Sequence, residues 1–184
     1  MFTTICSNPE EMPAVDEVRD LYAAAAAEPP LSEATDAAAL YAFVYASARQ
    51  HDQVTVASMR EERRLVAFCY GHPWRWTEQS YAWADQLRER LGDVADQLEE
   101  SVSLNLLARD PRSRRRGLGR SVLQHWLHAM GGRPCWLATT DMPTPARRLY
   151  ADLGFVTIGH GPDAPDGNPA LILRRPADDG ATAS

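Results

Sequence analysis

A short run of arginine and glycine near the middle of the chain has the residue types of an anion-binding turn. The run Arg114–Gly119, which reads R-R-R-G-L-G, follows an apolar, strand-like segment at Ser101–Ala108 and leads into an amphipathic helix at Leu118–Met130. The first N–H groups of a helix have no partner inside the helix, and its dipole adds positive potential there. Glycine lets the main chain approach an anion closely. The order of strand, glycine turn and helix therefore predicts an anion site built from backbone amides.

Two other interpretations of this turn stay open. The arginines would also suit an ordinary solvated loop, as most charge runs do, or a contact with nucleic acid. The turn is not a P-loop because the chain has no lysine, and Val122 stands where a G-x-G-x-x-G motif has its third glycine. The net charge of −6 opposes a nucleic-acid partner, so none is expected.

A second motif, Pro145–Phe155, reads P-A-R-R-L-Y-A-D-L-G-F and contains Tyr150. Its pattern A-x-x-L-Y-x-x-L-G-F closely resembles a signature of the GCN5-related N-acetyltransferases, the GNAT family. The run D-P-R-S-R-R-R-G-L-G resembles the acetyl-CoA loop of the same family. The two motifs stand in the family's order with a strand between them. The resemblance covers most of the chain from Ser101 to Arg174, whereas the N-terminal half agrees only in the order of its elements.

The resemblance implies an α+β (α/β) fold with a mixed, mostly antiparallel central sheet of six to seven strands flanked by helices. A single domain is expected over residues 1–175, with a disordered tail at 176–184. Residues 72–100 form an aromatic and helical insertion between the third and fourth expected strands.

Local patterns place the elements of both halves. Phe2–Cys6 reads as a strand, and two helices follow it. The second helix has Asp36 as its expected N-cap and one side formed by Leu40, Phe43, Val44 and Ser47. A hairpin, a strand, a short helix and two more strands are expected at Gln53–Gly71, Cys135–Thr140, Ala146–Leu153, Phe155–Gly159 and Ala170–Arg174.

Acetyl-CoA is the acyl donor that the resemblance implies. Its pyrophosphate would meet the glycine turn and the helix start, and its pantetheine would pair with the end of the preceding strand. The implied contacts come from Leu107, Arg109, Arg114, Arg115, Arg116, Gly117, Leu118, Gly119, Arg120 and Arg147. Arg112, Arg147 and Arg148 are candidates to neutralise the phosphates, and simple exposure to solvent is the alternative for each of them. Pro143 stands where many members of the family have asparagine.

Tyr150 is the expected catalytic residue, because the tyrosine of this motif lies near the thioester sulfur in the family and donates its phenolic proton. A structural tyrosine packed in the cofactor cleft is the alternative. Asn105, Trp74 and Trp76 are expected to contact the acceptor, and packing of the insertion is the alternative for the two tryptophans. Members of the family often have a glutamate on the strand that ends at Ala108, and this strand has none. The general base that deprotonates the amine is therefore open among Glu78, Glu99, Glu100, His72, Asp141 and a water chain.

The expected function is transfer of an acetyl group from acetyl-CoA to a primary amine of a small molecule or peptide, directly in a ternary complex. A non-catalytic acyl-CoA-binding or sensing module is the alternative.

Composition limits the other classes. The 184 residues are 45% hydrophobic, yet no apolar run has the length of a membrane span and the N-terminus lacks the shape of a signal peptide, so no membrane partner and a cytoplasmic location are expected. Cys6, Cys69 and Cys135 form no C-x-x-C pair and are expected in the core, without zinc, another metal or a disulfide. The oligomeric state stays open, with a homodimer as one arrangement.

Overall fold

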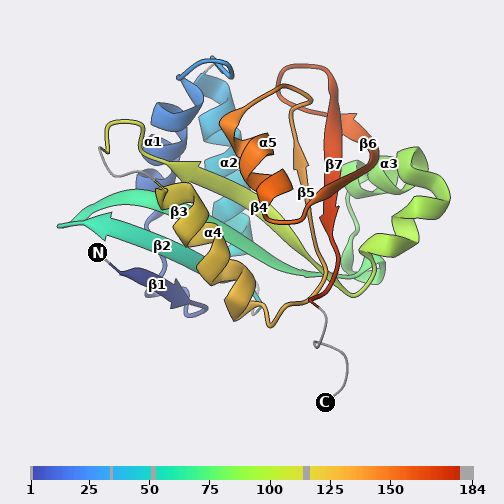
Figure 1. Cartoon of the computed structure of the whole chain (residues 1–184), viewed down its shortest axis with the longest axis horizontal. Helices are drawn as coiled ribbons and strands as arrows, with labels where there is room; N and C mark the ends of the chain where they lie inside the picture. The colour runs from blue at the N-terminus through green and yellow to red at the C-terminus, as the bar shows by residue number, and fades with distance from the viewer. Residues whose placement is uncertain (1, 34, 51–52, 114–116, 179–184) are drawn as a thin grey trace. The chain divides into compact units, whose positions relative to one another are not determined.

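The computed structural model describes residues 2–33, 35–50, 53–113 and 117–178 (Figure 1). Its contacts group into two compact units. Unit 1 comprises residues 1–72 and 105–129, and unit 2 comprises residues 73–104 and 130–184. Seven strands are hydrogen-bonded in the order β1-β2-β3-β4-β5-β7-β6. Strands β3 and β4 each contribute residues to both units.

Unit 1 contains the N-terminal strand, three helices and the hairpin. Its elements are β1 (Thr3–Cys6), α1 (Val15–Ala26), α2 (Thr35–Ala48), β2 (Thr55–Glu61), β3 (Arg64–Trp74), the second half of β4 (Ser101–Arg109) and α4 (Leu118–Ala129). Strands β1, β2 and β3 pair antiparallel. The strand, two helices and hairpin stand in the expected order.

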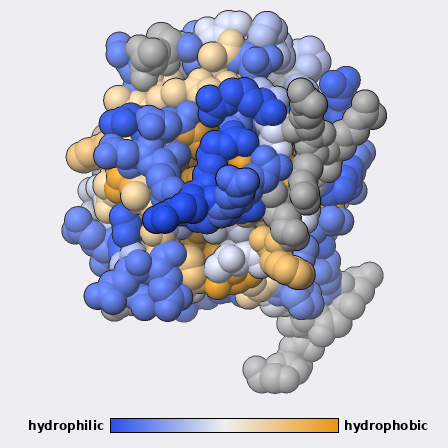
Figure 2. Space-filling view, turned by 90° about the vertical axis from the view of Figure 1, so that its left-hand side faces the viewer, coloured by the Kyte–Doolittle hydropathy of each residue, from blue (hydrophilic) through white to orange (hydrophobic). Residues whose placement is uncertain are grey.

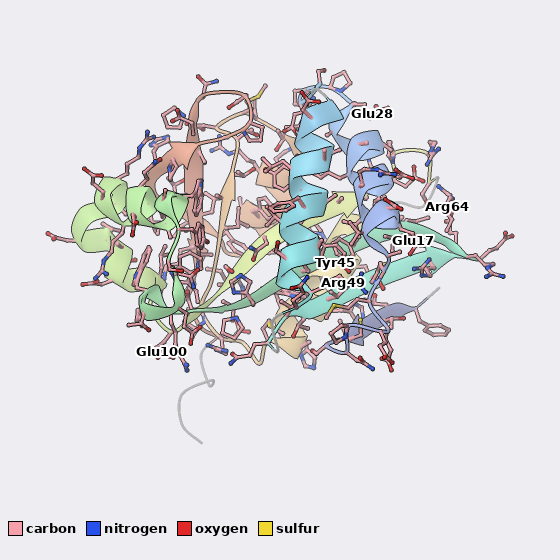
Figure 3. All side chains as sticks on the ribbon, turned by 180° about the vertical axis from the view of Figure 1, so that it is seen from behind. Glu17, Glu28, Tyr45, Arg49, Arg64 and Glu100 are labelled. Carbon is pink, nitrogen blue, oxygen red and sulfur yellow. The ribbon has the colours of Figure 1, made fainter. Side chains whose placement is uncertain are left out.

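Helices α1 and α2 cover one face of the unit 1 strands. Their buried side chains join those of alternate strand residues in one apolar cluster that includes Val18, Tyr45, Val56, Phe68 and Tyr70. The Tyr45 hydroxyl donates a hydrogen bond of 2.9 Å to the Pro13 carbonyl, which satisfies a polar group inside this core. Figure 3 shows α2 in front of the strands, with Tyr45 on the helix.

Helix α4 packs on the opposite face. Successive strand residues point to opposite faces, so Thr55 and Cys69 lie across from Val56 and Phe68. The indole N–H of Trp126 donates to the Thr55 carbonyl at 2.9 Å, and the Cys69 Sγ lies 3.7 Å from the Val122 carbonyl oxygen. The alternation of the sequence therefore places a helix layer on each face of this unit's strands (Figure 1).

Unit 2 contains the insertion and the C-terminal elements. These are the first half of β4, the 3-10 helices η1 (Trp76–Glu78) and η2 (Gly92–Leu98), α3 (Ala82–Leu91), β5 (Cys135–Thr139), α5 (Pro145–Asp152), β6 (Val156–Asp163) and β7 (Pro169–Arg175). Strand β4 pairs parallel with β5, whereas β7 pairs antiparallel with both β5 and β6. The expected mixed sheet and the helical insertion between the third and fourth strands are both present.

Within unit 2 the insertion packs on β6 through glycines of that strand. A methyl group at Gly161 would lie 2.8 Å from the Ile172 Cδ1 and 3.0 Å from the Leu87 Cδ1, so glycine lets α3 approach the strand closely. Arg90 fastens this contact, because its Nη1 donates to the Gly161 carbonyl at 2.8 Å and pairs with Asp163 at 3.0 Å.

Helix α2 departs from the sequence expectations. The side that carries Leu40 and Phe43 is exposed, at 53% and 70%, while the alanines on the other side are buried with Tyr45. The helix is apolar all round and has no polar stripe that would mark its outer face. Asp36 is also not the N-cap, because α2 begins at Thr35 and Asp36 lies in its first turn, where its charge suits the helix dipole.

The cysteines lie in the core, as the sequence predicts. All three cysteines are buried and unbridged. No helix within the described ranges is both long and apolar enough to cross a membrane. In the expected tail at 176–184, the N–H of Asp178 donates to the Gly132 carbonyl at 2.9 Å, so the third residue of that segment is anchored. Residues 179–184 lie outside the description. The single domain over residues 1–175 stays a prediction.

Glu17 fastens α1 to β2, and its ion pair predicts a pH-dependent stability. Its two carboxylate oxygens accept bonds of 2.6 and 2.8 Å from Arg60, and this hydrogen bonding lowers the pKa of Glu17. A lowered carboxylate pKa stabilises the fold above the unfolded pKa, and the effect is lost as the pH falls through the folded pKa. Glu17→Gln should therefore lower the free energy of unfolding by about 0.5–1 kcal/mol at neutral pH.

Urea denaturation at pH 7 and at about pH 3, below the usual glutamate pKa, tests this. The difference between Glu17→Gln and the wild type should shrink at the lower pH. Asp20→Asn, which removes an exposed carboxylate from the same helix, is the control. A loss for Glu17→Gln that is equal at both pH values would contradict the ion-pair explanation.

Candidate active site

The expected anion turn ends in unit 1 at the start of α4. Gly117 has a φ of +79°, a left-handed conformation that favours glycine, and its carbonyl accepts the Ser121 N–H at 2.9 Å. Gly117 thus caps the helix, and the N–H groups of the first turn, beginning at Leu118 and Gly119, have no acceptor inside it. No acidic side chain occupies that turn. Arg114, Arg115 and Arg116 lie outside the described residues.

Burial of one side of α4 fixes the direction of this helix. Leu118, Val122, Leu123, Trp126 and Leu127 are buried, as their helical spacing predicts. Because the buried stripe begins at the first helical residue, the N-terminal turn is anchored by a buried side chain, as the middle of the helix is. Arg120, in the same turn, is half-buried.

The end of β4 presents the other predicted contacts of unit 1. Leu106 and Ala108 point into the cluster beneath α1 and α2. Asn105, Leu107 and Arg109 therefore share the opposite face, where Asn105 and Leu107 are half-buried and Arg109 is exposed. The structure thus brings the predicted strand contacts onto one accessible face, directly before the loop that leads to Gly117.

Tyr150 lies in unit 2 on α5, and local signals define that helix. The Thr144 hydroxyl accepts the Arg147 N–H at 3.1 Å as the N-cap, and Pro145 occupies the first turn. Gly154 ends the segment with a φ of +85°. Tyr150 is 7% exposed, and its ring centroid lies 5.7 Å from that of Phe155. Tyr150 is therefore almost completely buried, on a short helix with a defined start and end.

Arg147 is paired with a carboxylate. Its Nη1 lies 2.7 Å from an oxygen of Asp141, and the other oxygen of Asp141 lies 3.1 Å from the His160 Nε2. These contacts, first the hydrogen bond with His160 and then the charge of Arg147, lower the pKa of Asp141. A carboxylate with a lowered pKa is a weaker proton acceptor, which makes Asp141 a poor base.

The tryptophans predicted at the acceptor site belong to the core of the insertion. Trp74 is 2% exposed and makes edge contacts with Trp76 and Trp136, at centroid distances of 5.3 and 4.7 Å. The Trp76 indole N–H donates to the Ala95 carbonyl at 3.2 Å, and the Arg88 guanidinium lies 5.5 Å from its ring centroid. This is the packing arrangement that the sequence left as the alternative. Acceptor contact by either residue stays a prediction.

The carboxylates of the insertion have partners of their own. Glu78 and Glu100 both pair with Arg75, at 3.4 and 3.2 Å, and Glu99 accepts the Trp76 N–H at 2.9 Å. Each of these contacts engages its glutamate with a partner inside the insertion. The geometry therefore favours none of the three as the base.

The sequence analysis missed two residues, each of which supports the predicted site residues of its own unit. Thr144 caps α5, and the Thr-Pro pair before the second motif is the signal that would have found it. Asp110, between β4 and the glycine turn, is a fully buried carboxylate. Its place in a run of arginines masked it, because a mixed charge run reads as exposed.

Comparison with known proteins assigns the class. The profile of the Acetyltransferase (GNAT) family matches residues 15–155. The chain therefore belongs to the GNAT family of acetyltransferases, which implies acyl-CoA-dependent acetyl transfer. No curated protein sequence matches the chain.

Solved structures resemble the chain over nearly its whole length. A structure from Corynebacterium glutamicum, described as histone acetyltransferase HPA2 and related acetyltransferase, has a TM-score of 0.63 and 19% identity, over 97% of this chain and 98% of that chain. The ribosomal-protein-S18-alanine N-acetyltransferase of Escherichia coli has 0.58 and 18%, over 100% and 99%. The PaiA N-acetyltransferase of Thermoplasma acidophilum, in complex with coenzyme A, has 0.58 and 10%, over 96% and 99%. At these identities the likeness shows the fold, which confirms the expected fold class.

Thr144 supports the helix of Tyr150, which predicts a measurable cost for its removal. Thr144→Ala should lower the free energy of unfolding by about 1 kcal/mol, because the Arg147 N–H loses its acceptor. Thr144→Ser keeps the hydroxyl and is the matched control. Urea denaturation of the three proteins decides, and an equal loss in both variants would assign the effect to the threonine methyl group instead of the cap.

Proposed function

We propose that the chain is an acetyl-CoA-dependent N-acetyltransferase that moves the acetyl group to a primary amine by direct transfer. The observation that carries the proposal is the start of α4, where a left-handed glycine caps a helix whose first turn has no acidic side chain. Such a turn suits a diphosphate, because main-chain N–H groups and the helix dipole both favour negative charge.

The strand contacts support the same proposal. Leu107 and Arg109 lie on the accessible face of β4 just before the loop, so their main-chain groups suit the amide-rich pantetheine arm. Arg147 is already paired with Asp141, which weakens its prediction as a phosphate contact. The cofactor site that we propose therefore relies on backbone at Leu107, Arg109 and Gly117–Arg120, together with the arginines of the turn.

In the proposed chemistry the acceptor amine attacks the thioester carbonyl carbon, the carbon–sulfur bond breaks, and the sulfur leaves as a thiolate that needs a proton. We assign that proton to the phenol of Tyr150. The near-complete burial of Tyr150 on a helix with a defined start and end supports this assignment, because general acid catalysis requires a positioned proton donor. The acceptor amine loses its own proton to a base, for which a water chain suits this site better than the paired carboxylates.

An acyl-CoA-binding module without catalysis is the second candidate. It is favoured by the absence of a carboxylate from Ser101–Arg109 and by the pairing of Glu78, Glu99, Glu100 and Asp141 with other groups. Release of free thiol from acetyl-CoA, measured across a panel of amines, separates the two candidates. A protein that binds acetyl-CoA but releases no thiol with any amine would favour the module.

Gly117→Val tests the cofactor turn. Valine is disfavoured at a φ of +79°, so the variant should shift the main chain and abolish coenzyme A binding measured by calorimetry. A Cβ at Gly117 meets no atom within 4 Å, which makes steric damage to the core a poor explanation. Gly131→Val is the matched control, because Gly131 has a φ of +69° and the same open surroundings just beyond the other end of α4. Unchanged affinity in Gly117→Val would remove the pyrophosphate assignment.

Tyr150→Phe tests the proton donor. Loss of the hydroxyl should lower kcat by about 100-fold or more while the Kd for acetyl-CoA barely changes, because the phenol acts on the departing thiolate. Stopped assays of thiol release give kcat, and calorimetry gives Kd. An equal loss in both quantities would assign Tyr150 to cofactor packing.

A further inference from the structure

A buried carboxylate stands at the entrance to the glycine turn. Asp110 follows β4 directly, and its side chain is 1% exposed. One oxygen accepts the Arg112 N–H at 2.8 Å and the Arg112 Nε at 3.0 Å. The other accepts the Arg112 Nη2 at 3.2 Å and also pairs with Arg64 Nη1. Burial of a carboxylate costs free energy unless hydrogen-bonded cations compensate it, so Arg64 and Arg112 must keep their positions around Asp110.

The contacts of Asp110 continue to the tip of the β2–β3 hairpin. Arg64 Nη2 lies 3.0 Å from one oxygen of Glu61, whose other oxygen accepts the Ser113 hydroxyl at 3.1 Å. Main-chain hydrogen bonds join the same segments. The Asp110 N–H donates to the Val66 carbonyl at 2.8 Å, and the Ser113 N–H donates to the main-chain carbonyl of Asp110 at 3.2 Å. The segment from Asp110 to Ser113 is thus fastened at both ends.

The hairpin tip is itself anchored to α1. Arg60 pairs with Glu17 and donates to the Arg63 carbonyl at 2.7 Å. Figure 3 labels Glu17, which lies on α1, and Arg64, which lies at the hairpin. Figure 2 views the side where this tip lies in Figure 1, and hydrophilic side chains dominate the middle of that face. A solvated surface gives no apolar reason for order here, so the ion pairs supply it.

We propose that Asp110 is a positioning residue for the diphosphate-binding turn. Its contacts fix the chain from the end of β4 to Ser113, so that the approach to the main-chain N–H groups at the start of α4 is held in place before the cofactor arrives. The inference rests on the proposed function, because it assigns a cause to the shape of that same turn. A preorganised loop binds more tightly because less conformational freedom is lost on binding.

The charge balance of the cluster supports this role. Asp110 and Glu61 supply two negative charges, and Arg64 and Arg112 supply two positive ones, so the cluster is neutral. A lone carboxylate three residues after Leu107 would repel a polyanion. The neutral cluster fastens the loop without that penalty, and it occupies Arg112, which sequence reasoning offered to the phosphates.

Asp110→Asn separates positioning from simple electrostatics, because the two effects have opposite signs. Asparagine keeps an oxygen for the Arg112 N–H but loses the charge that holds both guanidinium groups. If charge alone mattered, removal of a negative group would tighten coenzyme A binding. If Asp110 positions the turn, calorimetry should give an affinity for coenzyme A that is about tenfold weaker, since hydrogen bonds to charged groups are the strong ones. The KM for acetyl-CoA should rise while kcat changes little.

Arg19→Gln is the control, because it also removes one arginine but breaks only exposed ion pairs with Asp16 and Asp20 within α1. Its coenzyme A affinity should equal that of the wild type. Ser113→Ala is the second variant, which changes no charge and removes only the bond to Glu61. It should weaken binding by about two- to tenfold and decides the question if Asp110→Asn does not fold.

Three results distinguish the inferences. If the wild type binds no coenzyme A, the proposed function fails and this inference fails with it. If the wild type binds and Asp110→Asn binds equally well or more tightly, Asp110 has no positioning role while the proposed function stands. The same conclusion follows if Asp110→Asn does not fold and Ser113→Ala binds like the wild type. Weaker binding in both loop variants, with Arg19→Gln unchanged, supports the positioning role.

Discussion

Burial of one side of α4 against the strands of unit 1 is the constraint on which the candidate cofactor site depends. The helix cannot rotate or slide without exposing Trp126, whose indole N–H is bonded to the Thr55 carbonyl, or Leu118 in its first turn. Both ends of the apolar stripe are therefore fixed by the hydrophobic effect. The direction of the first-turn N–H groups follows from that fixation, and so does the potential that an anion would meet there.

A helix start alone is a common feature, and the start of α4 differs in the contacts that hold the loop before it. The chain must leave β4, turn and enter α4 with a left-handed residue at Gly117. Backbone in such a turn loses much conformational entropy unless other contacts hold it. Here the contacts are charged and come from the β2–β3 hairpin, through Arg64 and Glu61. The apolar core positions the helix, and the ion pairs position the approach to it.

Local patterns were sufficient for the elements that combine periodicity with a clear stop signal. Helix α5 lies between Thr144-Pro145 and Gly154, and β2 alternates as half of a hairpin, so both were predictable within one or two residues. Helix α2 was different because its faces are all apolar and only tertiary packing chooses between them. The structure buries the small alanines, which fit beside Tyr45, and leaves Leu40 and Phe43 outside. Volume and shape decided that outcome, and a hydrophobicity pattern contains neither.

The arginines illustrate the same limit for the site. The resemblance to the family suggested Arg112 and Arg147 as phosphate ligands, yet each has a carboxylate partner in its own unit, Asp110 and Asp141. A guanidinium that already holds a carboxylate must exchange one anion for another, which yields little net free energy. At the start of α4 the N-cap residue, Gly117, has no side chain that could accept the first main-chain N–H groups, and the first helical turn contains no acidic residue. A chain with a net charge of −6 can therefore recognise a polyanion by the direction of its backbone more than by its total of positive side chains.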